Sequence, residues 1–301
     1  MIQSIKVTNH LGESIEMELS CPEKTGLLIN DIDGLGPPTA NINTTELSIL
    51  DGAVFNSSRV GSRNIVISMI LLPLVTIEDS RLRIYKFFPI KKKVTIEITT
   101  DRRSCITEGY VETVEPDIFS EQESCQVSVV CPDAYLYSIV PTVIYFTGIQ
   151  SLFTFPFSNN SLTENQLVMG EINKVDTYTI NYEGTVEIGI TLIVSFTSAV
   201  KGLVIYDTKT RKILRIDDEI LKVAIGSYFK KGDELTIVTQ RGQRKATVFR
   251  DGRTINIINA LKRPIGWLTL SAGNNQFSYA AEEGSNNIEF RIEYTTAYDG
   301  V

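Results

Sequence analysis

The chain has 301 residues, with 29 Lys or Arg against 36 Asp or Glu, so its formal net charge is −7. An acidic chain lacks the basic face that neutralises phosphates, which argues against simple DNA or RNA binding. The single histidine, His10, lies in a turn-like segment and argues against histidine-based zinc sites and most catalytic triads. The hydrophobic fraction of 43% is that of a globular protein with one large domain or two of ordinary size.

The cysteines and the apolar runs narrow the class of protein further. No cysteine pair has C-x-x-C spacing, so we expect reduced, mostly buried thiols in a protein made in a cytoplasm. The first residues lack an apolar signal core, which argues against a cleaved leader. The longest apolar run, residues 65–75, is shorter than the about 20 residues of a membrane helix, so no membrane insertion is expected. The cysteines are Cys21, Cys105, Cys125 and Cys131.

A long irregular segment spans residues 26–56. Two glycines followed by a Pro-Pro pair predict stiff, extended backbone with few hydrogen bonds. Since so long a connection within a compact domain is usually functional, we expect an arm, around residues 33–56, that reaches onto a neighbouring subunit. Deleting residues 35–45 should then leave a folded monomer. The candidate subunit-contact residues are Gly34, Leu35, Gly36, Pro37, Pro38, Asp51 and Gly52.

One helix is predicted after residue 75. Thr76 and Asp79 have the spacing of a capping box, with Asp in place of Glu, and Pro89 ends the run. Three apolar residues recur between them at a spacing of three: Leu82, Tyr85 and Phe88.

The same segment carries a local basic face. It is interpreted as a solvated helix edge or, alternatively, as an electrostatic contact with a neighbouring subunit. The candidate contact residues are Arg81, Arg83 and Lys86, and the face continues through Lys91, Lys92 and Lys93.

Alternation of apolar and polar residues dominates the remaining chain. Residues 94–98, 188–196 and 288–294 alternate as strands with one wet face do, and Asp-Gly and Gly-Asn turns separate such runs. Many short strands at this spacing predict a mainly β fold of sandwiches or open barrels.

A change in composition near Asp133 predicts two domains, residues 1–135 and 136–301. Residues 134–163 contain no charged side chain, which is more typical of packed strands than of a mobile linker. A patch reserved for another subunit is the alternative. The aromatic residues of this stretch are Tyr135, Tyr137, Tyr145, Phe146, Phe153, Phe155 and Phe157.

No assembled active site is recognisable. The nucleophile elbow, the P-loop and the dinucleotide fingerprint are missing, and residues 31–34 lack the later ligands of a calcium loop. Residues 217–219 are interpreted as a solvated turn rather than a paired acid and base. Trp267 could stack on a sugar ring, but packing at the core or its rim is the preferred interpretation. No cofactor or metal is expected, and a wall hydrolase is the enzyme alternative.

Several fragments together resemble the distal tail proteins of long-tailed phages. Their order and spacing carry the resemblance, because each fragment is short, and residues 150–225 do not contribute. The fragments are residues 33–38, 51–55, 63–67, 81–88, 109–112, 117–120, 131–135, 232–233, 251–252, 265–267, 270 and 273–275.

The resemblance implies a structural virion protein, not an enzyme, at the distal tail tip, synthesised in the host bacterial cytoplasm. The N-terminal domain would be a tail-tube-like β-sandwich with one flanking α-helix, six copies of which form a ring with the arm gripping the adjacent subunit. The C-terminal domain would be a galectin-like β-sandwich that faces outward as a docking domain.

The resemblance also implies partners. They are the tail-tube protein, a tail-associated lysin or tape-measure protein, and receptor-binding or baseplate proteins. Phage DNA would pass only as cargo through a neutral or acidic channel, with Lys91, Lys92 and Lys93 pointing elsewhere. Two alternatives remain: a related contractile-tail particle, and a carbohydrate-binding adhesin that contacts host cell-wall sugars through Trp267.

Overall fold

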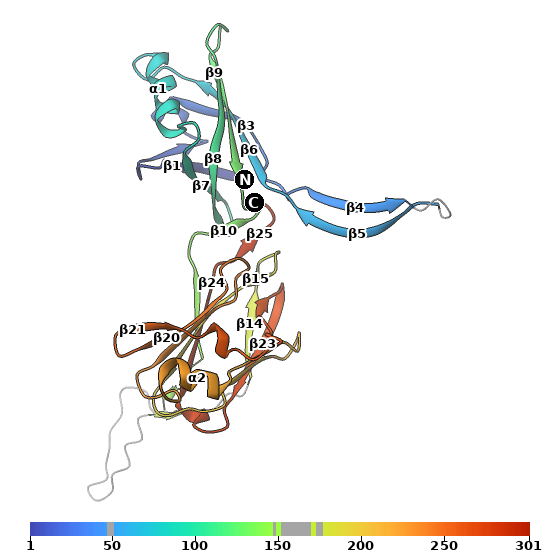
Figure 1. Cartoon of the computed structure of the whole chain (residues 1–301). Coiled ribbons are helices and arrows are strands. Elements are labelled where there is room, and N and C mark those ends of the chain that lie inside the picture. Colours follow the sequence, from blue (N-terminus) through green and yellow to red (C-terminus); the bar gives the residue numbers. More distant parts are fainter. Residues whose placement is uncertain (47–50, 147–148, 152–169, 173–176) are drawn as a thin grey trace, which may run out of the picture. The chain divides into compact units, whose positions relative to one another are not determined.

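The chain divides into two compact units, shown in Figure 1, of which the computed structural model describes residues 1–46, 51–146, 149–151, 170–172 and 177–301. The first unit comprises Met1–Val140 together with Ala297–Val301, and the second comprises Pro141–Thr296. The expected division after residue 135 differs from this in two respects. The first unit continues five residues further, because residues 136–138 pair within its sheet, and the last five residues of the chain return to it.

Nine strands of the first unit form one hydrogen-bonded sheet. They are β1 (Ile2–Thr8), β2 (Ser14–Glu18), β3 (Leu27–Asp33), β6 (Arg63–Leu71), β7 (Lys93–Thr100), β8 (Ser104–Asp117), β9 (Ser124–Cys131), β10 (Leu136–Ser138) and β25 (Ala297–Tyr298). The order is β2-β1-β7-β8-β9-β6-β3, and β10 pairs with both β8 and β25. A 3₁₀ turn, Pro22–Lys24, precedes β3.

This sheet folds over a single core. Its edge strands β2 and β3 contact each other, and side chains from strands across the sheet, such as Val7, Ile67, Ile96 and Val127, belong to one buried cluster. The alternation in residues 94–98 is confirmed, since every second side chain of that run is buried. The first unit is therefore a sandwich built from one continuous sheet, and the prediction of a mainly β fold is confirmed.

The predicted helix forms as α1 (Ile77–Phe87). Its capping box is present: the Asp79 amide donates to Thr76 Oγ1 at 3.2 Å, and the Thr76 amide donates to Asp79 Oδ2 at 3.0 Å. Of the three apolar residues predicted at a spacing of three, only Phe88 is buried. Leu82 and Tyr85 are exposed, whereas the buried side chains Ser80, Ile84 and Phe88 recur every four residues, as one face of an α-helix requires.

Three of the four thiols are buried in the first unit, as predicted. Cys105, Cys125 and Cys131 are buried, Cys21 is half-buried, and all four are free thiols. Burial raises the pKa of Cys125 to about 11, and it also raises those of Cys105 and Cys131.

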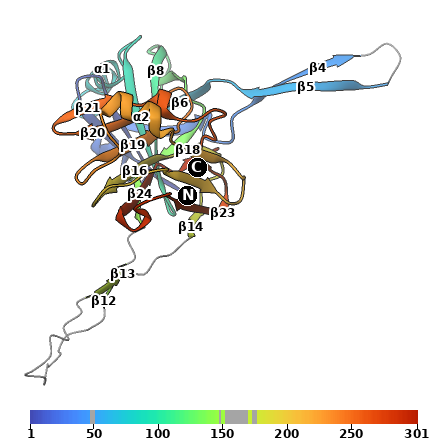
Figure 2. The same ribbon diagram turned by 60° about the horizontal axis from the view of Figure 1, so that its bottom comes forward.

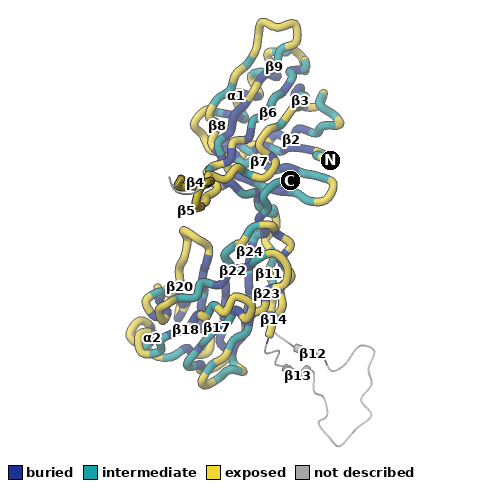
Figure 3. Tube along the Cα trace, turned by 90° about the vertical axis from the view of Figure 1, so that its right-hand side faces the viewer, coloured by how far each residue is buried: buried dark blue, intermediate teal, exposed yellow. Residues whose placement is uncertain are grey.

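The expected arm contains a β-hairpin of β4 (Ala40–Glu46) and β5 (Ala53–Val60), which projects from the sheet of the first unit (Figures 1 and 2). Every residue of both strands is exposed, as the yellow tube in Figure 3 shows. The expectation that residues 26–56 are irregular is wrong here, because the strands pair from Ala40↔Val60 to Glu46↔Ala53, whereas the Gly-Pro piece at residues 34–39 forms no strand. Polar residues make up most of β4 and half of β5, which is consistent with pairing without a core.

The second unit contains two main sheets. The first has the order β11-β24-β16-β19-β20-β21 and the second β14-β23-β17-β18. Their strands are β11 (Thr142–Tyr145), β14 (Tyr178–Tyr182), β16 (Thr191–Phe196), β17 (Val204–Asp207), β18 (Ile213–Arg215), β19 (Glu234–Val238), β20 (Lys245–Arg250), β21 (Arg253–Asn256), β23 (Gly273–Ala280) and β24 (Ile288–Tyr294).

Shorter elements complete the second unit. The strand β12 (Ile149–Ser151) pairs with β13 (Gly170–Ile172), and β15 (Ile188–Gly189) pairs with β22 (Thr269–Leu270). Two 3₁₀ turns are Ile258–Ala260 and Ser285–Asn287.

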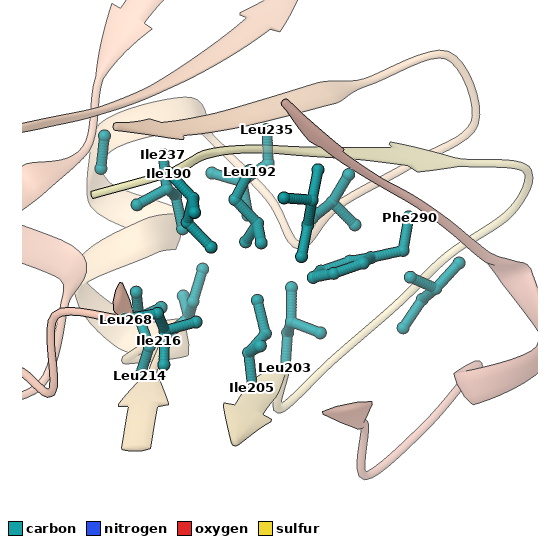
Figure 4. Packing of buried hydrophobic residues seen from close by; sticks show 14 of the residues in the cluster. Ile190, Leu192, Leu203, Ile205, Leu214, Ile216, Leu235, Ile237, Leu268 and Phe290 are labelled. Carbon is teal, nitrogen blue, oxygen red and sulfur yellow. The ribbon is translucent and has the colours of Figure 1, made fainter. Parts of the chain in front are cut away.

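The two sheets pack face to face as a β-sandwich. Figure 4 shows Leu192, Leu235, Ile237 and Phe290 of one sheet facing Ile205 of the other across one buried cluster. Of the aromatic stretch, Phe146 is buried here and Tyr145 is exposed, whereas Phe153, Phe155 and Phe157 lie outside the described residues.

A second helix, α2 (Asp218–Ile225), replaces the solvated turn expected at residues 217–219. That interpretation is wrong, because Asp217 Oδ1 accepts hydrogen bonds from the amides of Glu219 and Ile220 and so caps the helix. Leu221 and Ile225 are buried one turn apart, and Gly226 ends the helix in the left-handed conformation.

Candidate functional site

One face of the β4–β5 hairpin carries most of its large apolar side chains, together with Thr44, Glu46 and Ser58. Residues paired across an antiparallel ladder share a face, and successive pairs alternate between faces. The pairs Ala40↔Val60, Ile42↔Ser58 and Thr44↔Phe55 therefore lie on one face. Ile42 is 63% exposed and Phe55 is 61% exposed. We call the side chains Ala40, Ile42, Phe55 and Val60 the apolar stripe.

The opposite face of the hairpin is mainly polar. Asn43 Nδ2 donates to Ser57 Oγ at 3.1 Å, and Asn56 Nδ2 donates to Thr45 Oγ1 at 2.6 Å. Asn56 is the extra residue of a bulge, which interrupts the register after Asn43 and keeps Phe55 on the apolar face. One side of the hairpin thus satisfies its own polar groups, while the other offers exposed hydrocarbon.

The root of the hairpin, residues 34–39 and 61–63, is held by Arg63, the first residue of β6. This side chain is only 3% exposed. Its Nε donates to the Ala134 carbonyl at 2.7 Å, its Nη1 donates to the Gly36 carbonyl at 2.8 Å and to that of Gly34, and its Nη2 donates to that of Asp299. Desolvation by burial lowers the pKa of Arg63, and these carbonyls replace water around the guanidinium.

The residues predicted to contact a neighbour divide between this root and the hairpin tip. Leu35 is buried in the core of the first unit, and its carbonyl accepts the Val301 amide at 3.2 Å. Gly34 adopts a φ of 86°, and a Cβ there would collide with the Asn64 carbonyl. Pro38 is half-buried. The remaining four candidates are exposed: Gly36, Pro37, Asp51 and Gly52. Deleting residues 35–45 would therefore remove part of the core as well as the arm.

The predicted basic contact residues have partners within the chain. Arg81 pairs with Glu123 at 3.3 Å, and Lys86 pairs with Glu13 at 2.8 Å. The hydrogen bond from Lys86 lowers the pKa of Glu13. Arg83 Nη1 reaches the Thr25 carbonyl at 3.5 Å. Nearby, Lys93 pairs with Glu108 at 2.8 Å. This basic face is partly neutralised by the chain's own carboxylates.

Trp267 is half-buried against the core of the second unit. The guanidinium carbon of Arg244 lies 4.9 Å from the centroid of its ring. This cation covers a ring face on which a sugar would stack, a neighbour that the local sequence around Trp267 did not indicate.

The second unit also has a surface hollow of about 660 Å³ that no sequence prediction covered. Its lining mixes both signs of charge, with Arg215 and Lys262 near Asp218 and Glu282. Asp218 Oδ1 is buried without a hydrogen-bond partner, and burial raises the pKa of this carboxyl. Among the described residues, no group of three or more His, Cys, Asp or Glu could hold a metal ion. None of the helices described is long and apolar enough to cross a membrane.

Residues 183–298 match the family model described as "Siphovirus-type tail component, C-terminal domain". No curated protein matches the chain. The resemblance to the distal tail proteins of siphophages is thereby confirmed for the C-terminal domain, and one solved structure shares the fold of almost the whole chain.

Two solved structures are similar over almost the whole chain. The crystal structure of the Dit protein of phage SPP1, described as a paradigm of the hub adsorption apparatus in phages that infect Gram-positive bacteria, has a TM-score of 0.64 at 13% identity. The match covers 97% of this chain and 98% of that chain. A chain of the phage P2 baseplate, in its activated conformation with Ca, has a TM-score of 0.45 at 12% identity and the same coverage.

Proposed function

We propose that this protein forms a hexameric hub at the distal end of a phage tail. The hub joins the tail tube to baseplate, fibre or receptor-binding proteins and leaves a channel for DNA. The observation that carries the proposal is the β4–β5 hairpin, which is exposed along both strands and carries the apolar stripe on one face. The tail-component match and the fold shared with the SPP1 protein support it.

The hairpin suits a contact between copies of this chain. A two-stranded hairpin is marginal on its own in water, and exposed strand edges invite pairing, so such an element gains stability when a partner covers it. An arm of one subunit that binds a different surface of the next makes a head-to-tail contact, which closes into a ring when the rotation allows. Six copies would have a mass of about 200 kDa.

The other proposed roles follow from this arrangement. The first unit forms the tube-like ring, and Arg81, Arg83 and Lys86 lie at its subunit boundary while keeping their partners within the chain. The second unit is a galectin-like domain that docks receptor-binding or baseplate proteins. The tail-tube protein and a tail-associated lysin or tape-measure protein bind the ring, and DNA passes through a neutral or acidic channel. The protein functions in the virion after synthesis in the host cytoplasm, and its role is structural rather than enzymatic.

The test removes the hairpin without touching its root. Replacing residues 41–59 by Asn-Gly connects Ala40 to Val60, which are already paired, through a two-residue turn. Leu35 and Arg63 stay in place, so the variant should fold with an unchanged thermal midpoint.

Mass photometry and negative-stain images should show six-fold rings for the full chain and monomers for the variant. Rings that persist without the hairpin would contradict the proposal, as would a full chain that stays monomeric at every concentration.

A further inference from the structure

The root of the hairpin sets the direction in which β4 and β5 project from the first unit. Its strands β4 and β5 have no buried residue, so little besides the root ties them to the first unit. On the return side the chain enters β6 at Arg63 itself. On the outgoing side the same guanidinium binds the carbonyls of Gly34 and Gly36. One side chain therefore holds both ends of the hairpin's base together.

The last residues of the chain lie against this root. The Val301 amide donates to the Leu35 carbonyl, and the Asp299 carbonyl accepts from Arg63 Nη2. Gly300 lies so close to the root that an added Cβ would come within 2.9 Å of the Leu35 carbonyl oxygen and 3.0 Å of the Gly36 carbonyl carbon. The same segment is anchored on its other side, because β25 pairs with β10 and Arg103 lies 4.5 Å from the Tyr298 ring centroid.

We propose that residues 297–301 and Arg63 together fix the root of the hairpin, so that ring assembly depends on a segment that is not part of the hairpin. Arg63 is a positioning residue: its guanidinium is satisfied by carbonyls from three separate segments, and withdrawal of one leaves a buried donor unpaired. Loss of the C-terminal contact then loosens the hold on Gly34 and Gly36. The assembly part of this inference rests on the function proposed for the hairpin.

The test is a matched pair of glycine substitutions. Gly300→Ala pushes a methyl group into the backbone of residues 35 and 36, whereas Gly36→Ala adds the same group where nothing lies within 4 Å. Neither glycine has a positive φ, so the two changes differ mainly in this contact.

We expect Gly300→Ala to speed amide hydrogen exchange in residues 34–40 and 61–63 about tenfold, because local opening becomes easier. The thermal midpoint should fall little, and the ring fraction should drop at a fixed concentration. Gly36→Ala should match the native protein in both measurements.

A second variant tests Arg63. Arg63→Lys keeps the charge but replaces the fork of five donors by one ammonium, which cannot reach all four carbonyls. It should also speed exchange at the root, and adding Gly300→Ala to it should change exchange less than Gly300→Ala alone does. Additive effects would contradict a shared mechanism.

The outcomes separate this inference from the proposed function. Native exchange rates at the root in both Gly300→Ala and Arg63→Lys would overturn the inference, whatever the oligomeric state. A loosened root with an undiminished ring fraction would overturn the link to assembly, provided that the variant without residues 41–59 is monomeric. If that variant still forms rings, the function proposed for the hairpin fails instead.

Discussion

Arg250 and Asp233 form an almost completely buried ion pair in the second unit, with Arg250 Nε 2.8 Å from Asp233 Oδ1. The same guanidinium donates to the carbonyls of Ile225 and Tyr228, at 2.6 and 2.8 Å. It thereby connects β20 to the end of α2 and to the turn that precedes β19.

We expect Asp233→Ala to lower the free energy of unfolding by about 3–5 kcal/mol, because it leaves the Arg250 charge buried without its partner. Asp251→Asn is the matched control, since the Lys230–Asp251 pair is exposed and screened by water. The control should unfold at nearly the native urea concentration. Equal losses in the two variants would contradict the importance assigned to burial.

The two faces of the hairpin can be tested separately. Phe55→Ser should abolish ring formation by removing the largest side chain of the apolar stripe, while the thermal midpoint stays unchanged because the residue is exposed. Val54→Ser, one residue away on the opposite face and 48% exposed, should still assemble. Mass photometry at matched concentrations measures both, and loss of rings in both variants would mean that the apolar face has no special role.

The thiols should differ in reactivity. At pH 8, a thiol reagent should label Cys21 rapidly, whereas Cys105, Cys125 and Cys131 should react only after unfolding, because they are buried and their raised pKa values keep them protonated. Rapid labelling of more than one thiol per native chain would contradict the packing of the first unit.

The raised pKa of Cys125 also has a consequence for stability. As pH rises from about 9 to about 11, the unfolded thiol ionises before the folded one, so the unfolded state is favoured and stability falls. Urea unfolding should show a smaller fall over this interval for Cys125→Ala than for the native chain. An equal fall in the two proteins would mean that other groups account for the pH dependence.

The tryptophan fluorescence of this protein comes from Trp267 alone, because the chain has one tryptophan. Arg244→Ala should expose the indole face and increase quenching of its fluorescence by acrylamide, at a cost of about 0.5–1 kcal/mol in stability. Trp267→Ala should cost about 1–3 kcal/mol, because the ring packs against the core. If the native protein binds purified host wall polysaccharide and folded Trp267→Ala does not, the adhesin alternative is favoured instead.

Local signals predicted local structure well. The capping pair Thr76 and Asp79 located α1, and alternation located the strand at residues 94–98. Helix α2 was missed because three consecutive carboxylates resemble a turn. The sequence nevertheless contains the signals of this helix. They are a capping residue at Asp217, apolar residues one turn apart at Leu221 and Ile225, and a glycine after its end at Gly226.

Long-range contacts could not be predicted in this way. The Gly-Pro-rich segment indicated the arm, but nothing near Leu35 shows that its carbonyl binds an amide 266 positions later, at Val301. The four carbonyls around Arg63 likewise come from segments that only the folded sheet brings together. Burial of Leu35 is a tertiary effect, which local composition does not encode.

The pairing of β10 with β25 has a topological consequence. The chain leaves the first unit after β10 and re-enters it at β25, and Tyr137 and Ala297 are partners in that ladder. The second unit is thus an insertion between two neighbouring strands, and near its own two ends Thr142 pairs with Tyr294. A domain whose ends meet can be exchanged for another without disturbing its host, so the junctions at residues 140–141 and 296–297 are natural points for grafting a different module.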